Sequence, residues 1–521
     1  MKLKTFPIAL IAVFGLVLNF TNISAETTLK PLPVITDDCG GMGCLDRRNL
    51  TLDQAQDYID DAMARNEALR AAKQAKSESK TKGNKGQGLA QGQKNSETQL
   101  VFLNFEQTND TFPAVSFFGP GIFASHQFTQ IERDEIQRRI AADYAAFNVA
   151  FTQERPESGD YSTLNFECQA ASGQCVDFTR GILFGRAQAI DILNQDRNDS
   201  AFIDVGLWEV FAQIDPSGFF LELFSGLSLA DNDGDVNALL SAAVVNQASN
   251  TGAHELGHNL GLRHHDSFGA PGTGIPNTGT PGPFGFFPVF DGPEGAVESI
   301  LHTMASGASV GLPLNGSTTS DRFFSERSVV KLTANQRARQ VSEAAVSGFN
   351  KKVTLHKVVA PNTIVEGQNA DGKLDIREAL IRGQISVSGE VDTYRFTAKA
   401  GQFVSAEFNG FDVPVGEPVI GAIKLYYIEP DNSLTLVAQN FQNFEGFDAL
   451  LVDAPLEKNG DYIMSVSSPN FISFGYDAND QPILFPLDET GNGDLRDGDY
   501  NLSIYIVEGK PGNGVSKVPG A

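Results

Sequence analysis

Four of the seven histidines in this chain lie within residues 254–265, in a pattern that suits a metal ion. On a helix, residues four apart lie on the same face, so His254 and His258 can direct two imidazole nitrogens at one ion. Glu255 would lie beside the ion, where a carboxylate can accept a proton from a bound water molecule. The types and spacing of these residues predict a zinc site that activates water.

A turn after this helix is predicted at Gly261. A helix continued to position 264 would carry that histidine away from the metal, whereas glycine can adopt the left-handed conformation that ends a helix. The turn would bring back His264 as the third ligand and leave the fourth tetrahedral position of Zn²⁺ to water, as in catalytic sites. His265 and Asp266 are alternative third ligands, although the spacing favours His264.

A methionine downstream completes a longer pattern. Residues 254–264 read HELGHNLGLRH, and residues 299–307 read SILHTMASG, with small residues after Met304 that suit a tight turn. Together they resemble the metzincin clan of zinc metalloendopeptidases, whose signature is HExxHxxGxxH followed by a methionine turn. The resemblance implies that Met304 lies beneath the metal as an apolar floor and is not a ligand. The residue after the third ligand is His265 rather than Ser, Glu, Asp or Pro, and no tyrosine follows the methionine turn, so no family within the clan is indicated.

The expected activity is hydrolysis of peptide bonds in proteins. Zn²⁺ lowers the pKa of bound water to about 7, so Glu255 would take a proton near neutral pH and pass it to the leaving amine. One alternative is a secreted binding or adhesion protein with a structural or inactive zinc site, although such a site has no use for Glu255. Another is a zinc hydrolase that acts on a non-peptide bond, which substrate profiling would distinguish.

The N-terminus predicts export. Residues 1–25 consist of a charged start, an apolar run and a short segment ending at Ala25, which is the arrangement of a cleaved signal peptide. No other segment is apolar enough to span a membrane, so we expect a secreted monomer that acts on protein or peptide substrates. The net charge of −25 and the pI of about 4.6 argue against nucleic acid and anionic membranes as partners.

Four cysteines in an exported chain favour two disulfides. Their spacing pairs Cys39 with Cys44 and Cys168 with Cys175, although other connectivities are compatible with the sequence. For Cys39 there is an alternative, because in some metzincins a pro-region cysteine occupies the fourth zinc position and keeps the enzyme latent. The sequence DCGG at residues 38–41 resembles such a switch.

Acidic side chains alternate around a glycine in the sequence DNDGD at residues 231–235. Asp231, Asp233 and Asp235 offer hard oxygen ligands that suit Ca²⁺ in a flexible turn. The segment lacks the rest of an EF-hand loop, and the helix dipole also favours carboxylates at the start of a helix. An acidic helix start is therefore the stronger interpretation, with calcium as the alternative.

Strands and helices alternate in the part of the chain that must position the zinc residues. Hydrophobic periodicity predicts strands at residues 100–105, 149–152 and 202–211 and a helix at residues 130–147, and residues 323–328 lead into a further helix that ends at about residue 345. The metal helix would begin after Asp235 and end at Gly261. We therefore expect an α+β catalytic domain, metzincin-like, in which helices pack on a mixed twisted sheet.

The C-terminal part has short alternating strands divided by turn residues, a pattern typical of an all-β sandwich. Its segments VDTYRF, GDYIMSV and GDYNL, which begin at residues 391, 460 and 498, resemble the bacterial prepeptidase C-terminal (PPC) domain. The match extends over about residues 380–507. The resemblance implies an accessory role in secretion, substrate attachment or maturation, with removal from the mature enzyme as one outcome.

These observations predict that the chain is a precursor made of several parts. We expect a signal peptide (1–25), a pro-region with a flexible linker (26–97), the catalytic domain (98–350), a linker (351–379), a PPC-like β-sandwich (380–510) and a flexible tail (511–521).

Overall fold

The computed structural model describes most of the chain between residues 98 and 508. The predicted signal peptide, nearly all of the pro-region, the C-terminal tail and the four cysteines (Cys39, Cys44, Cys168 and Cys175) lie outside the described residues. The described residues are 37–38, 98–167, 176–177, 181–188, 190–192, 194, 196–267, 302–305, 322–337, 340–348, 350–359, 364–365, 368–369, 375–411, 417–440, 448–476, 482–486 and 495–508.

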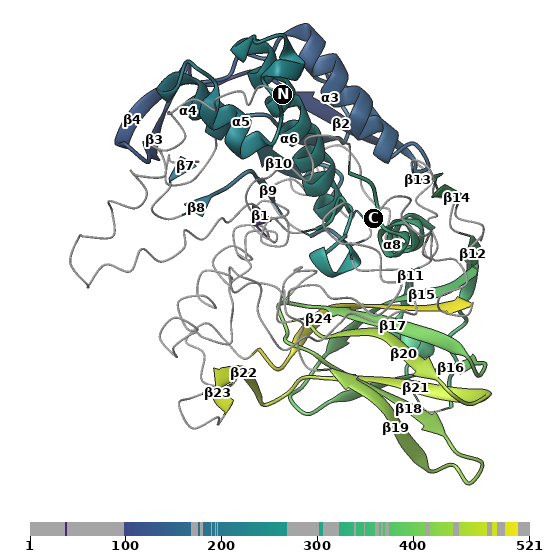
Figure 1. Cartoon of the computed structure of the whole chain (residues 1–521). Coiled ribbons are helices and arrows are strands. Elements are labelled where there is room, and N and C mark those ends of the chain that lie inside the picture. Colours follow the sequence, from purple (N-terminus) through teal and green to yellow (C-terminus); the bar gives the residue numbers. More distant parts are fainter. Residues whose placement is uncertain are drawn as a thin grey trace, which may run out of the picture.

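A six-stranded mixed sheet carries the helices of the N-terminal half (Figure 1). Its strands are β1 (Asp37–Asp38), β2 (Gln99–Asn104), β5 (Val149–Thr152), β6 (Ser162–Asn165), β9 (Gly185–Ala187) and β10 (Ser200–Ile203). In the order β1-β9-β10-β6-β2-β5, the last four strands are parallel, and β9 is antiparallel to β10. The predicted strands at residues 100–105 and 149–152 are confirmed.

A smaller sheet and two hairpins lie beside the main sheets. The four-stranded sheet has the order β4-β3-β7-β8 and consists of β3 (Thr111–Ser116), β4 (Gly119–Ala124), β7 (Val176–Asp177) and β8 (Gly181–Ile182). The hairpins are β13 (Ile364–Val365) with β14 (Gln368–Asn369), and β22 (Phe471–Tyr476) with β23 (Pro482–Pro486).

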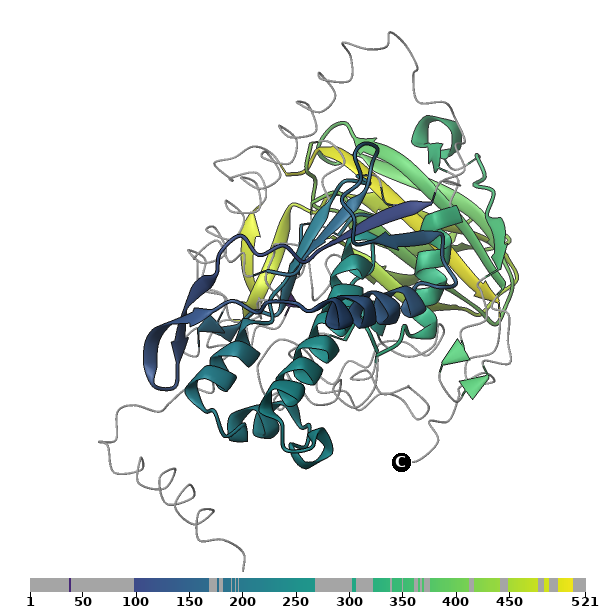
Figure 2. The same ribbon diagram turned by 90° about the horizontal axis from the view of Figure 1, so that it is seen from above.

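Two long helices pack side by side on the six-stranded sheet (Figure 2). The first, α3 (Gln130–Asp143), starts with a capping box between Thr129 and Glu132. The second, α6 (Val236–Asn259), has Asp235 as its N-cap, whose carboxylate accepts the N–H of Asn237 at 2.9 Å. The predicted helix at residues 130–147 and the predicted start of the metal helix are confirmed.

The prediction of one strand across residues 202–211 is wrong. The strand β10 ends at Ile203, and α4 (Gly206–Ile214) follows, so Trp208 lies in a helix. The Asp204 carboxylate accepts the N–H of Gly206 at 2.8 Å and turns the chain between the two elements. The residues form a continuous apolar run, and such a run fits a buried strand as well as a buried helix. The sequence therefore does not show where the strand ends and the helix begins. The short helices α5 (Phe219–Ser225) and η2 (Ala230–Asn232) then lead to α6.

The helix predicted to end at about residue 345 is too long. The helix α8 (Glu326–Arg337) is followed by β11 (Gln340–Ser342), α9 (Glu343–Val346) and β12 (His356–Val359). Both β11 and β12 pair with β15 (Asp375–Ile385). The β-sheet of the C-terminal part therefore takes in residues that the sequence placed in the catalytic domain and in a linker over residues 351–379.

The C-terminal part consists of two packed sheets, as predicted for a sandwich. Their strands are β15, β16 (Val391–Ala398), β17 (Gln402–Asn409), β18 (Ala422–Ile428), β19 (Leu434–Asn440), β20 (Leu450–Leu456), β21 (Gly460–Ser467) and β24 (Gly498–Glu508). One sheet has the order β11-β15-β24-β17-β20 and the other β16-β21-β18-β19. Apolar side chains from both sheets, such as Phe408, Tyr462 and Leu502, form a single buried core.

The outer face of the β15-β24-β17 sheet is covered by the N-terminal half. Figure 1 shows α8 lying over this sheet. Ile376, Tyr505 and Val507 belong to the hydrophobic core of the N-terminal half, although they lie on strands of the sandwich. The two halves are thus joined by one continuous apolar core.

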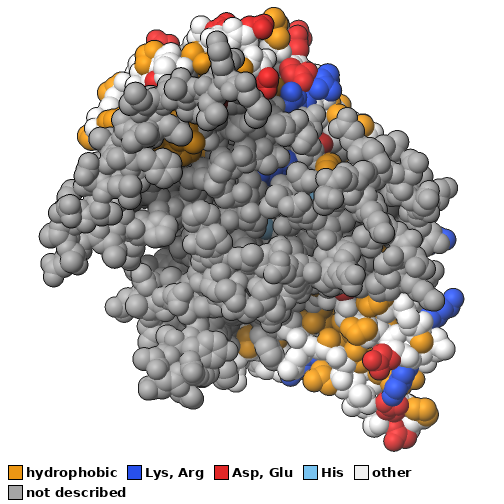
Figure 3. All heavy atoms as spheres, in the orientation of Figure 1, with side chains coloured by type: hydrophobic (Ala, Val, Ile, Leu, Met, Phe, Trp, Pro, Cys, Tyr) orange, Lys and Arg blue, Asp and Glu red, His pale blue; other side chains and the backbone are white. Residues whose placement is uncertain are grey.

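Among the described residues in Figure 3, acidic, basic and apolar side chains occur together at the upper end, over the helices, and again at the lower end, over the strands. Among the described residues, no helix is both long and apolar enough to cross a membrane.

Candidate metal centre

The last turns of α6 are enclosed on all sides. His254, Glu255 and His258 are each no more than 1% exposed. On the side of α3, the hydroxyl of Tyr144 donates to the carbonyl of Ala253 at 2.8 Å. The helix is therefore fixed against its neighbours at the turn that presents the two histidines.

The helix ends as the sequence predicted, at a left-handed glycine. Gly261 has a φ of +90°, its N–H bonds the carbonyl of His258 at 2.8 Å, and the N–H of Leu262 bonds the carbonyl of Gly257 at 2.9 Å. This pair of bonds is a Schellman motif. A Cβ at Gly261 would also lie 2.8 Å from the Cα of Ile192, so both conformation and space require glycine.

The turn brings His264 to the other two histidines. The Nε2 atom of His254 lies 3.0 Å from that of His258 and 3.1 Å from that of His264. Donor atoms on a tetrahedral zinc ion with Zn–N bonds of about 2.0–2.1 Å lie about 3.3 Å apart, so the spacing fits zinc. His265 is not part of the group, and its Nε2 lies 3.3 Å from the carboxylate of Asp266.

Hydrogen bonds to two carbonyls fix which nitrogen of each ring is free to bind a metal. Nδ1 of His254 donates to the carbonyl of Thr303 at 2.6 Å, and Nδ1 of His258 donates to that of Leu262 at 2.8 Å. Because a carbonyl only accepts, each Nδ1 carries a proton, and in the neutral ring Nε2 has a lone pair. Two lone pairs that face each other at 3.0 Å repel unless a cation lies between them.

Burial keeps the rings in the neutral form that binds metals. Desolvation lowers the pKa of His254 to about 3, although the bond to Thr303 opposes this. Desolvation, together with the neighbouring histidines, also lowers the pKa of His264 well below its usual value. The group can therefore hold a metal ion, and its three nitrogen donors are compatible with zinc.

Met304 packs against the helix α6, and its predicted place beneath a metal ion stays a prediction. Its side chain is fully buried, and its sulfur packs against Gly257, where a Cβ would come within 2.5 Å of it. The turn is held by the N–H of Thr303, which bonds the carbonyl of Phe323 at 2.8 Å. The same turn provides the carbonyl that orients His254, so it has a structural role toward the ligands.

Glu255 faces the strand β9. A Cβ at Gly185 would lie 2.5 Å from the Oε1 atom of Glu255 and 2.5 Å from the Thr251 methyl group. Glycine at this position therefore makes room for the carboxylate. The same glycine is paired in register with Asp37 of β1, so β1 runs past the strand that Glu255 faces.

The acidic segment before α6 forms a helix start. Asp235 is the N-cap, and Asp233 has a left-handed φ of 55° in the turn that precedes it. Among the described residues, the groups with three potential ligand atoms within 4.8 Å of one another are the histidines and Glu343 with Glu390 and Asp392. Calcium binding by Asp231, Asp233 and Asp235 stays a prediction.

Several residues that support the site were not found from the sequence. Thr303 acts through its backbone carbonyl, which leaves no pattern in the sequence, and Gly185 lies on a strand too short to recognise. Arg263 and Asp266 lie on either side of His264 and are buried, and Asp266, which the sequence offered as an alternative third ligand, instead binds Lys331. Their partners Lys331 and Glu407 are too distant in sequence to be inferred.

The sequence matches no protein-family model, and no curated protein matches it. Among solved structures, the chain is similar to the pre-peptidase C-terminal domain of a collagenase from Bacillus anthracis, with 16% identity, a TM-score of 0.16, and coverage of 24% of this chain and 88% of that one. It is also similar to a periplasmic inhibitor of g-type lysozyme from Aeromonas hydrophila, with 15% identity, a TM-score of 0.15, and coverage of 25% and 86%.

Proposed function

We propose that this protein is an exported zinc metalloendopeptidase of the metzincin type. The observation that carries the proposal is the convergence of His254, His258 and His264, with two of the rings oriented by carbonyls, on the same helix end as the buried Glu255. A structural zinc site needs a fourth protein ligand, and no fourth ligand joins this group among the described residues. An open position beside a buried carboxylate suits hydrolysis.

The roles of the chain's own residues follow from their positions. Bound zinc would supply a Lewis acid that polarises a peptide carbonyl and lowers the pKa of a water molecule. Glu255 would accept the proton of that water and deliver it to the leaving amine. The carbonyls of Thr303 and Leu262 hold two of the rings in place, which raises their basicity and fixes their direction.

The proposal includes export and synthesis as a latent precursor. Its support is the sequence of residues 1–25 and the pairing of β1 with β9 at Gly185. An edge strand can bind an extended peptide by adding it as a further strand. Because β1 occupies that edge next to Glu255, a substrate could pair there only after residues 37–38 had left.

The C-terminal sandwich is proposed to be of the PPC type, on the strength of the sequence pattern over about residues 380–507.

The competing function for the whole chain is secreted binding or adhesion with an inactive zinc site. The two differ in one property, which is whether the zinc-loaded protein breaks peptide bonds.

A chelation experiment tests the proposal. The processed protein would be incubated with casein alone, with 1,10-phenanthroline, and with chelator followed by excess zinc, and the products analysed by mass spectrometry. We expect new peptide termini that disappear with the chelator and return with zinc, and none from His258→Ala. Bound zinc without any cleavage of casein or gelatin would favour the binding protein, whereas cleavage that resists the chelator would exclude the zinc mechanism.

A further inference from the structure

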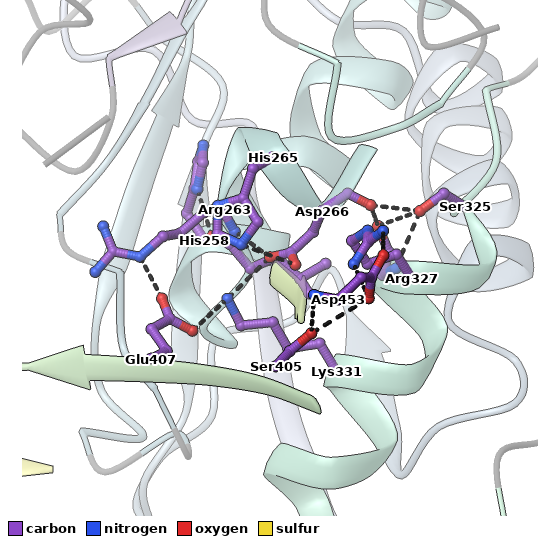
Figure 4. Close-up of polar contacts among 12 residues, drawn as sticks. His258, Arg263, His265, Asp266, Ser325, Arg327, Lys331, Ser405, Glu407 and Asp453 are labelled. Atoms are coloured by element: carbon purple, nitrogen blue, oxygen red, sulfur yellow. Dashed lines mark hydrogen bonds and ion pairs between the residues drawn. The ribbon is translucent and has the colours of Figure 1, made fainter. Parts of the chain in front are cut away.

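The loop that carries His264 is held by side chains of the β-sandwich (Figure 4). Arg263, the residue before it, is 1% exposed, and its Nε donates to the carboxylate of Glu407 at 2.5 Å. Its Nη2 donates to the side-chain oxygen of Asn409 at 3.0 Å. Glu407 and Asn409 both lie on β17, so the third-ligand loop is tied directly to a sandwich strand.

A buried lysine closes the connection. Nζ of Lys331, on α8, lies 2.9 Å from the Asp266 carboxylate and 2.8 Å from that of Glu407. Asp266 in turn accepts the backbone N–H of Arg263 at 2.8 Å. The backbone on both sides of His264 is thereby fixed to the same carboxylate of β17, directly through Arg263 and indirectly through Lys331.

A second ion pair binds α8 to the sandwich. Arg327 is fully buried and donates to both oxygens of Asp453, at 3.1 and 2.6 Å. Asp453 lies where the pairing of β17 with β20 shifts register, and it has a left-handed φ of 51°. Such a bulge redirects a side chain out of the regular alternation, here toward α8. The neighbouring Ser328 hydroxyl donates to the carbonyl of Asp266 at 2.9 Å.

The sequence of β17 matches this arrangement. Val404, Ala406 and Phe408 point into the sandwich core, and the alternate residues Ser405, Glu407 and Asn409 point the other way. On a free sandwich those three polar side chains would face water. Here all of them are at most 2% exposed, which means that the N-terminal half covers the sheet face that they occupy.

We propose that the β-sandwich is a structural part of the metal centre, and that Glu407 is a positioning residue for the third ligand, His264. The mature enzyme therefore retains the sandwich. If the sandwich were removed, Arg263, Lys331 and Arg327 would lose the carboxylates that balance their charges. Ile376 and Tyr505 would also be withdrawn from the core that they share with the N-terminal half. This inference rests on the proposed function only in taking zinc as the ion.

The test measures zinc affinity in the full chain rather than turnover. Zinc-free wild type and Glu407→Gln would be titrated with zinc against a chelating indicator, and the cooperativity of unfolding followed by circular dichroism. We expect the dissociation constant for zinc to rise about 10- to 100-fold in Glu407→Gln, the usual effect of losing an outer-shell partner. The matched control is Glu429→Gln, which removes the same charge from a surface pair with Lys458 on the same sandwich and should bind zinc as wild type does.

A second variant covers the case in which Glu407→Gln does not fold. Asn409→Ala removes a neutral partner of Arg263 and leaves every charge in place, so a smaller, several-fold loss of zinc affinity is expected. The deciding variant is Glu407→Gln if it folds, and Asn409→Ala if it does not. If that variant bound zinc as tightly as wild type, the positioning role would be overturned while the peptidase proposal stood. If the wild type itself bound no zinc, the proposed function would fail first.

Discussion

The sulfur of Met304 lies against the α-carbon of Gly257, the residue that precedes the second histidine of α6. A side chain at position 257 would have its Cβ 2.5 Å from that sulfur and 3.4 Å from a methyl group of Leu262. A glycine within a helix is ordinarily unfavourable, by about 1 kcal/mol relative to alanine. Its presence here is explained by the methionine, which requires the space.

The substitution Gly257→Ala should destabilise the protein even though alanine is the better helix former. Overpacking a core of this kind costs about 1–3 kcal/mol, and urea denaturation of the zinc-free protein would measure the loss. In the background of Met304→Ala the added methyl group would fill space left by the sulfur. The two substitutions together should therefore cost less than the sum of their separate costs, and strict additivity would contradict the close contact.

The substitution Gly185→Ala should impair turnover and leave zinc binding intact. The new methyl group would displace the carboxylate of Glu255, whose oxygen lies 2.5 Å from the Cβ position, and the atoms nearest to that position belong to Glu255 and Thr251. A displacement of about 1 Å in a catalytic group can lower kcat about 10²-fold. Zinc content by atomic absorption is the internal control. A variant with wild-type kcat would show that Glu255 does not need its observed position.

Release of the pro-region strand should activate the precursor. Asp38→Pro removes a backbone N–H from β1 and should weaken its pairing with Arg186, so the unprocessed protein should cleave casein faster than wild-type precursor.

Serine substitutions then separate the two roles considered for Cys39. A zinc switch predicts activation by Cys39→Ser alone, whereas a disulfide predicts the same effect from Cys39→Ser and Cys44→Ser. A precursor as active as the processed enzyme would contradict latency.

The stability of the protein should fall between pH of about 6.5 and about 9 because of His126. Burial alone would lower its pKa, but Glu132 and Glu209, at 3.4 and 2.8 Å, raise the pKa to about 9. Because the pKa is raised in the folded state, protonated His126 stabilises the protein fully below the unfolded pKa of 6.5. This stabilisation, at most about 3 kcal/mol, is lost as the pH rises through about 9. In His126→Gln the free energy of unfolding should vary less over this range, and an unchanged slope would refute the assignment.

The sequence predicted the metal centre more completely than the fold around it. The spacing of His254, His258 and His264, with a glycine between the last two, constrains geometry locally, so the helix, its end and the approach of His264 to the other two histidines all followed from short-range rules. The strand at residues 149–152 was also predicted, and the helix predicted at residues 130–147 is present over residues 130–143.

What the sequence did not predict depends on contacts distant along the chain. The apolar run before Trp208 fits either kind of secondary structure, and only its packing decides between them. The polar residues of β17 alternate like those of a solvated strand, and nothing nearby in sequence indicates that Arg263 and Lys331 cover them. The addition of β11 and β12 to the sheet of the C-terminal part could not be predicted for the same reason, since these strands are recognisable only through their pairing with β15.

The most direct test of the account is a comparison of wild type with Glu255→Gln, both processed to remove the pro-region, in bound zinc and in cleavage of casein. Glu255 follows His254 directly on α6, is fully buried, and is not part of the group of three histidines. We predict that both proteins bind about one zinc ion, as a three-histidine site should, and that only the wild type cleaves. Cleavage by both proteins at the same rate, or zinc binding without cleavage by either, would contradict the hydrolytic mechanism.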